Sequence, residues 1–112
     1  MGFAANQARV LSLISRKSDL ELEAQFISQH RMYLANMVSG FFNMSAKLEP
    51  GSQAAKVLEG RIQQLQQADK ILEMHLNRIN SQHQAVEKEL ESVKGMVQKN
   101  IQSSFGLMGG GR

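Results

Sequence analysis

The stretch KLEPGSQAA, residues 47–55, contains Pro50, the only proline of the 112-residue chain, and Gly51 follows it directly. Proline ends a helix because it lacks the backbone N–H and restricts the residue before it, while glycine adopts backbone angles that other residues avoid. Ser52 then offers a hydroxyl that can cap the start of a second helix. These residues predict a turn at about 48–52 between two helical arms.

Both arms carry apolar side chains at the two core positions, a and d, of a seven-residue repeat, and such repeats sustained over several heptads are typical of coiled coils. In the first arm these positions hold Val10, Leu13, Leu20, Ala24, Ile27, Leu34, Val38 and Phe41, with Lys17 and Arg31 as polar exceptions. In the second arm they hold Leu58, Ile62, Leu65, Leu72, Leu76, Ile79, Val86, Leu90, Val93 and Val97, with Asp69 and His83 as polar exceptions.

A short break between two such arms makes them antiparallel neighbours. The sequence therefore predicts a single all-α domain, an antiparallel coiled-coil hairpin of two long helices at about 3–47 and 53–104. A flexible, glycine-rich tail is expected at 106–112, where the repeat gives way to GLMGGGR.

Folding the chain at the turn places its polar exceptions opposite one another. Arg31 then faces Asp69, and we predict that this pair sets the register of the hairpin. Lys17 faces His83, which requires a neutral histidine or a nearby carboxylate from Glu21 or Glu87. Two interpretations of His83 stay open, a pH switch or a neutral histidine in a roomy core layer. A slip of about three residues also stays open, because antiparallel coiled coils often set a against d′.

A two-helix hairpin needs one apolar stripe per helix, but this chain has more than that. Apolar side chains off the a and d positions include Ile14, Phe42, Met44, Val57 and Ala68. The residues predicted to form an assembly face are Leu22, Phe26, Tyr33, Met37, Ile71, Met74, Met96 and Ile101. Exposed apolar faces on a helix require neighbours. Gly40, Gly60 and Gly95 lie inside the predicted helices, where close helix approach or chance surface substitution would explain them.

The composition favours an elongated helical protein and excludes several classes of function. Aromatic residues make up 5% of the chain, tryptophan and cysteine are absent, and the net charge of +3 comes from interspersed charges of both signs. The absence of cysteine fits a reducing compartment, and the charge pattern lacks the basic stripe of a nucleic-acid-binding protein. The chain has no apolar run of the roughly 20 residues that a membrane span needs.

The N-terminal residues 1–18 carry basic side chains without an acidic one, which is typical of transit peptides, but the apolar repeat through them favours the first turns of a helix. This segment lacks the apolar core of a secretory signal. The sequence leaves the location unknown: the cytoplasm and export without a classical signal peptide stay open, with a cell-surface assembly as one destination.

No catalytic, metal-binding or cofactor-binding residue is expected. His75 and His83 lie more than two helical turns apart, and no cysteine ligand is available. Asp69 and Glu73 are one turn apart on a polar helix surface, where solvation is the ordinary role of carboxylates. The terminal Gly109–Gly111 run opens no helix, so it is not a phosphate-binding loop. We therefore expect a protein that is not an enzyme.

The turn at Pro50-Gly51, the heptads on both sides of it and the apolar stretch IQSSFGLM at 101–108 resemble the helical-hairpin subunits of type III secretion needles and the terminal coiled coil of flagellins. The resemblance implies a subunit of a helical filament or tube, with hairpins packed side by side.

The leading hypothesis is a structural protein that self-assembles through lateral apolar faces, as a homo-oligomer or filament. The alternative is a coiled-coil adaptor or secretion-type chaperone that binds another helical protein. A membrane-surface role for residues 1–18 is the third hypothesis. Nucleic acid is not an expected partner, and no other membrane contact is expected.

Overall fold

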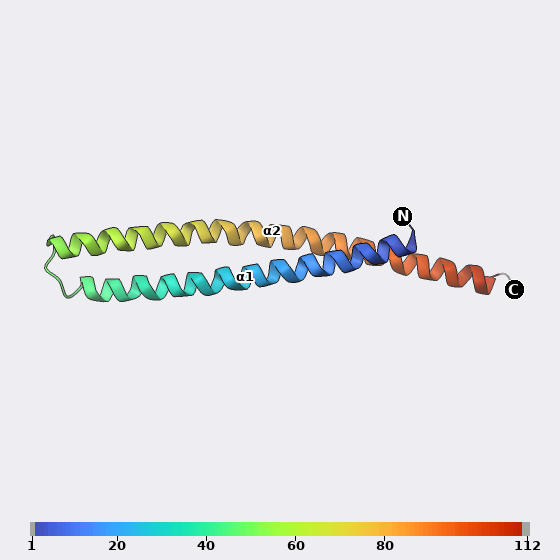
Figure 1. Cartoon of the computed structure of the whole chain (residues 1–112), viewed down its shortest axis with the longest axis horizontal. Helices are drawn as coiled ribbons and strands as arrows, with labels where there is room; N and C mark the ends of the chain where they lie inside the picture. The colour runs from blue at the N-terminus through green and yellow to red at the C-terminus, as the bar shows by residue number, and fades with distance from the viewer. Residues whose placement is uncertain (1, 111–112) are drawn as a thin grey trace. The chain divides into compact units, whose positions relative to one another are not determined.

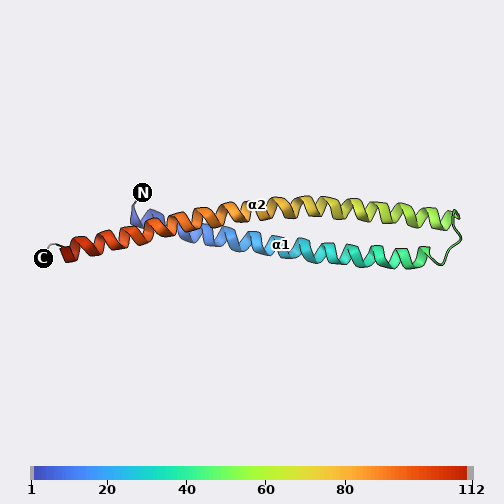
Figure 2. The same ribbon diagram turned by 180° about the vertical axis from the view of Figure 1, so that it is seen from behind.

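The computed structural model describes residues 2–110, with side chains described as far as residue 103. These residues form two α-helices, α1 at Phe3–Ser45 and α2 at Gln53–Gly110. In each of the two compact units of the chain, a segment of α1 and a segment of α2 run antiparallel and pack against each other (Figure 1 and Figure 2). The predicted all-α antiparallel hairpin with its turn at Pro50-Gly51 is confirmed.

The connection between the helices is built from two successive turns. After α1, Lys47 N donates to Met44 O over 3.1 Å and Leu48 N donates to Ser45 O over 3.1 Å, so the chain tightens as it leaves the helix. Ser52 N then donates to Glu49 O over 3.1 Å.

Pro50 and Gly51 occupy the two central positions of that second turn, and Gly51 has a φ of 77°. Proline first and a residue with positive φ second is the pattern of a type II turn. This geometry explains why the sequence reads EPGS at the point where the chain reverses.

Ser52 caps α2, because its Oγ accepts a hydrogen bond from Ala55 N over 3.2 Å and its carbonyl oxygen accepts the bond from Lys56 N. We expect Ser52→Ala to lower the free energy of unfolding by about 1 kcal/mol, since a backbone N–H loses its partner. Urea unfolding followed by circular dichroism measures the change. Gln53→Ala, one residue later, is the control and should leave stability nearly unchanged; an equal loss in both would contradict the cap.

The helix ends differ from the predicted ones. α1 ends at Ser45, two residues before the predicted residue 47, because residues 46 and 47 already belong to the tightened turn. α2 continues to Gly110, past the predicted end at about 104, so the predicted flexible tail is helical from 106 to 110. Glycine raises the cost of a helix by about 1 kcal/mol per residue without blocking it as proline does. Residues 111–112 lie outside the described part.

The chain divides into two compact units, each built from a segment of α1 and a segment of α2. Unit 2 is Glu23–Ile79 and contains the turn, and unit 1 contains residues 2–22 and 80–110 of the described chain. The buried apolar residues of unit 2 are Leu34, Ala55, Leu58, Ile62 and Ile79. Ala55 lies seven residues before Ile62, so it extends the predicted seam by one heptad.

Unit 1 has a seam of the same kind. Its cluster of buried residues is Leu13, Leu90 and Val93, with Val10 and Val86 packed against it. Leu20 is fully buried in the same unit. Every a and d residue predicted from the sequence is buried or half-buried, in both units. The hydrophobic seam is therefore where the heptad pattern predicts it.

Candidate protein-interaction surfaces

α1 carries a second heptad stripe within unit 2, at positions c and g. We call it the second seam. Its members are spaced by alternating steps of four and three residues: Phe26, His30, Tyr33, Met37, Gly40 and Met44. At about 100° per residue, its centre lies roughly 110° around the helix from the a/d seam. A helix with two seams has packing surfaces for two neighbouring helices.

The second seam is mostly exposed to solvent. Phe26 is 60% exposed and Tyr33 is 61% exposed, and Met44 is also exposed, while Met37 is half-buried beside the hairpin seam. The rings of His30 and Tyr33 meet edge to face, with centroids 6.5 Å apart and an angle of 63°. The apolar members of this stripe and Gly40 were noted in the sequence, but Gly40 was not assigned to the stripe, and His30, which completes its spacing, was missed.

α2 adds apolar residues to the same side of unit 2. Val57, Ala68 and Ile71 occupy c and g positions of α2, and in an antiparallel pair the g positions of the two helices flank the seam on one side. Val57 and Ile71 are exposed. We call the second seam together with these three residues the c/g face of unit 2.

The other predicted assembly residues do not belong to this face. Leu22, Met96 and Ile101 are exposed but lie in unit 1. Met74 is exposed in unit 2 at position f of α2. The assembly face predicted from the sequence is therefore divided between two units, and within unit 2 it is narrower than predicted.

Ile101 lines a separate groove in unit 1, on the e side of the seam. The groove has a volume of about 450 Å³, and its lining residues are Gln7, Val10, Leu11, Lys94, Val97, Gln98 and Ile101. Leu11 is among the most exposed apolar residues of the described chain and was not identified from the sequence. The heptad pattern could have identified Leu11, because it is an apolar residue at position b, directly after the seam residue Val10.

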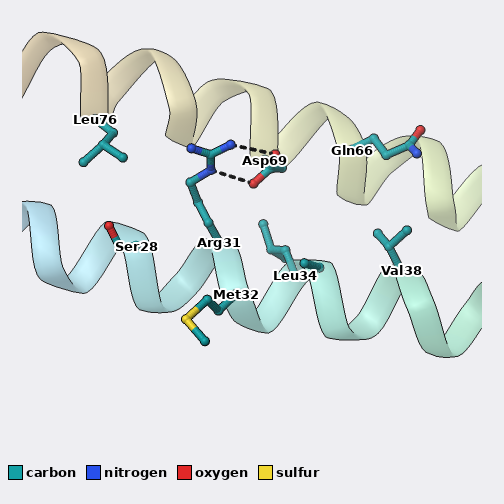
Figure 3. Close-up of a pocket in the computed structure, with 9 residues that line it drawn as sticks. Ser28, Arg31, Met32, Leu34, Val38, Gln66, Asp69 and Leu76 are labelled. Carbon is teal, nitrogen blue, oxygen red and sulfur yellow. Dashed lines mark hydrogen bonds and ion pairs between the residues drawn. The ribbon is translucent and has the colours of Figure 1, made fainter.

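Arg31 and Asp69 are in direct contact across the hairpin of unit 2 (Figure 3). Arg31 Nε donates to Asp69 Oδ1 over 2.8 Å and Nη2 donates to Asp69 Oδ2 over 3.2 Å, which is the bidentate geometry of strong ion pairs. Glu73 Oε2 lies 3.8 Å from Arg31 Nη2. The contact that the sequence suggested is present; that it sets the register stays a prediction.

Solvent limits what this pair contributes. The side chains of Arg31 and Asp69 are 30% and 37% exposed, and both line an open hollow of about 500 Å³ beside Ser28 and Ala35. The hydrogen bonds from Arg31 hold the pKa of Asp69 below its usual value, burial opposes this shift, and the positive charge of Arg31 adds to it. The same hydrogen bonds raise the pKa of Arg31.

A pH dependence follows from the lowered pKa of Asp69. The ion pair with Arg31 stabilises the fold in full above the pKa of about 3.9 that Asp69 has in the unfolded chain. This stabilisation is lost as the pH falls from there through the lower pKa of Asp69 in the folded chain. We expect Asp69→Asn to lower the free energy of unfolding at pH 7. At pH 3 the free energies of unfolding of this variant and the wild type should differ by less. Chemical unfolding at each pH measures both differences. The control is Asp19→Asn, which removes an exposed carboxylate that has no ion pair among the described residues. Its free energy of unfolding should stay close to that of the wild type at both pH 7 and pH 3.

Lys17 and His83, the second polar pair, lie beside the two carboxylates that the sequence offered as their partners. Lys17 Nζ lies 3.6 Å from Glu87 Oε1, one turn beyond His83, so Lys17 pairs with one of the two carboxylates that the sequence offered. His83 Nε2 lies 3.0 Å from Glu21 Oε1, and its Nδ1 lies 3.7 Å from Glu87. The nearby carboxylates that the sequence offered as one alternative are present. Lys17 pairs one turn beyond His83 because setting a against d′ shifts the two helices by about three residues.

Two polar residues near the start of α1 were not identified from the sequence. Arg9 forms an ion pair with Glu89. Asn6 is 2% exposed, and its Oδ1 has no hydrogen-bond partner among the described residues. Asn6 lies seven residues before Leu13, so the heptad pattern could have placed it in the seam. A buried asparagine in a coiled-coil seam favours one register at a cost in stability.

No group of three or more potential ligands among histidine, cysteine, aspartate and glutamate could hold a metal ion within the part of the chain that the structure describes. Over the same part, neither helix contains a stretch that is long and apolar enough to cross a membrane. Comparisons of the chain with protein-family models, with curated proteins and with solved structures gave no match.

Proposed function

We propose that the protein is a structural subunit that self-assembles through the c/g face of unit 2. The second seam carries this proposal, because it repeats with heptad spacing on a helix whose a/d seam is already occupied by α2. Scattered exposed apolar residues are ordinary on protein surfaces, whereas a contiguous stripe with helix-packing spacing is typical of an interface with another helix.

The size of the face is adequate for a specific contact. The second seam from Phe26 to Met44 is about 27 Å long, and two packed helices present a surface about 20 Å wide. Stacking two such faces would bury on the order of 1,000 Å² in total, which is the lower range of specific interfaces. A second copy of the chain supplies a surface of matching length and apolar character.

Growth beyond a dimer needs a second contact on each subunit. The unit 1 groove, with exposed Leu11 and Ile101, supplies a candidate for it. Two different contacts per subunit generate an open assembly when the symmetry does not close. This supports extending the proposal to a filament or tube, the assembly that the resemblance to secretion-needle subunits implies.

The experiment is sedimentation velocity of the wild-type chain across about 1–100 μM, with negative-stain electron microscopy of the most concentrated sample. The proposal predicts a sedimentation coefficient that rises with concentration, and particles larger than one hairpin. A monomer over the whole range would overturn it. That outcome would favour the adaptor or chaperone alternative, in which the same face binds a different helical protein.

A further inference from the structure

We infer that two copies of the chain stack their c/g faces antiparallel about a two-fold axis beside Tyr33, with Phe26 of each copy packed over Gly40 of the other. The inference rests on the proposed self-assembly and specifies its partner and geometry. It follows from the order of large and small residues along the second seam.

The c positions of the second seam are complementary to their own reverse. Phe26 lies seven residues before Tyr33, and Gly40 lies seven residues after it. Turning a copy of α1 end for end about Tyr33 therefore brings each phenylalanine over the other copy's glycine. A two-fold interface requires such self-complementarity, because each contact occurs twice. Placing a large residue over a small one is how helix surfaces interdigitate.

No contact among the described residues explains the glycine at position 40. A Cβ atom built on Gly40 would meet no heavy atom within 4 Å, so alanine fits there and would favour the helix more. Glycine at this position brings no benefit to the isolated hairpin. Under the inferred geometry it provides the flat site that the Phe26 ring covers.

The order of large and small residues on α2 indicates the same two-fold axis. Arg31 contacts Asp69 and Glu73, so Tyr33 lies across the hairpin from about residue 70. The apolar c/g residues Ala68 and Ile71 lie on either side of that point. Reversal about it sets Ile71 of one copy over Ala68 of the other, again a large residue over a small one.

The charges on the face are compatible with this reversal. Arg61 and Arg78 occupy c/g positions of α2, and reversal brings them near each other at both ends of the interface. Glu23 is the one carboxylate at a c or g position within residues 23–79, and it lies at the same level as Arg78 of its own chain. In the stacked pair Glu23 also lies at the level of Arg61 of the other copy, so one carboxylate lies at the level of both arginines.

Cysteine cross-linking tests the axis, because the chain contains no cysteine of its own. Tyr33→Cys places two thiols on opposite sides of the two-fold axis, close enough for a disulfide between copies. Met32→Cys is the matched control, since Met32 directly precedes Tyr33, is similarly exposed and occupies position b, outside the face. We expect Tyr33→Cys to form covalent dimers at least about tenfold faster under mild oxidation.

A glycine pair tests the packing of Phe26. Gly40→Ala inserts a methyl group beneath that ring and should weaken self-association roughly tenfold in sedimentation equilibrium. Gly60→Ala makes the same change at an exposed helical glycine at position f of α2, with open space around it, and should leave self-association unchanged. Both variants should keep the wild-type helix content.

The outcomes separate this inference from the proposed function. If the wild type self-associates while the two cysteine variants cross-link equally and the two alanine variants associate equally, the antiparallel geometry is wrong and self-assembly stands. If the wild type stays monomeric at all concentrations, the proposed function fails, and this inference fails with it. Selective cross-linking through residue 33 with selective weakening by Gly40→Ala supports both.

Discussion

We expect Leu20→Ala to lower the free energy of unfolding by about 2–4 kcal/mol, as measured by urea unfolding followed by circular dichroism. Leu20 is 0% exposed and occupies the a/d seam of unit 1. Truncating a buried leucine removes its transfer free energy and leaves a cavity that the surrounding structure fills only in part. A loss of this size is a large share of the stability of a small domain.

Leu22→Ala is the matched control, because it makes the same change two residues later on the same helix. Leu22 is 50% exposed, so its truncation should cost no more than about 0.5 kcal/mol. Leu20→Met keeps the volume of the side chain and should cost less than about 1.5 kcal/mol. Equal losses for Leu20→Ala and Leu22→Ala would mean that the seam does not hold unit 1 together.

The hairpin itself could be predicted because two independent signals in the sequence agree. The heptad repeats identify two helices with one buried stripe each, and the single proline, followed by glycine, marks where they reverse. The end of α2 could not be predicted in the same way, because glycine makes a helix costlier without ending it. Local composition at GLMGGGR therefore predicted a boundary that α2 passes.

The contacts between the helices were predictable only to within one turn. A heptad pattern is compatible with setting a against a′ or a against d′, and the two differ by about three residues. Arg31 reaches Asp69 under either choice because its side chain is long. Lys17 pairs with Glu87, one turn beyond His83, because this carboxylate has the opposite charge and lies within reach.

The candidate interaction surface was predictable as a set of residues but not as a single face. The sequence pattern alone groups apolar residues outside the a/d positions into one set, and most of those predicted are exposed. Exposure alone does not assign them to one side of the hairpin. Separating c and g from b and f would have distinguished Phe26 and Tyr33 from Leu22 and Met74. Only the structure shows that the predicted residues belong to two units.

We expect the double variant Phe26→Glu with Tyr33→Glu to show no self-association up to about 100 μM, while its helix content stays at the wild-type level. Burying each ring in an interface contributes about 1.5–3 kcal/mol, so losing both weakens association at least about a hundredfold. Each glutamate would also have to enter the interface as an unpaired charge. Sedimentation velocity reports the association, and circular dichroism reports the helix content.

The control is Met32→Glu with Met74→Glu, which introduces the same charge at two exposed apolar positions of unit 2 outside the c/g face. This variant should associate as the wild type does. Because the change in net charge is identical, a difference between the two variants reports the position of the residues and not general repulsion between subunits. Equal loss in both would attribute assembly to net charge. Loss of helix content in the first variant alone would place Phe26 or Tyr33 in the core of the hairpin, where their exposure of 60% and 61% does not place them.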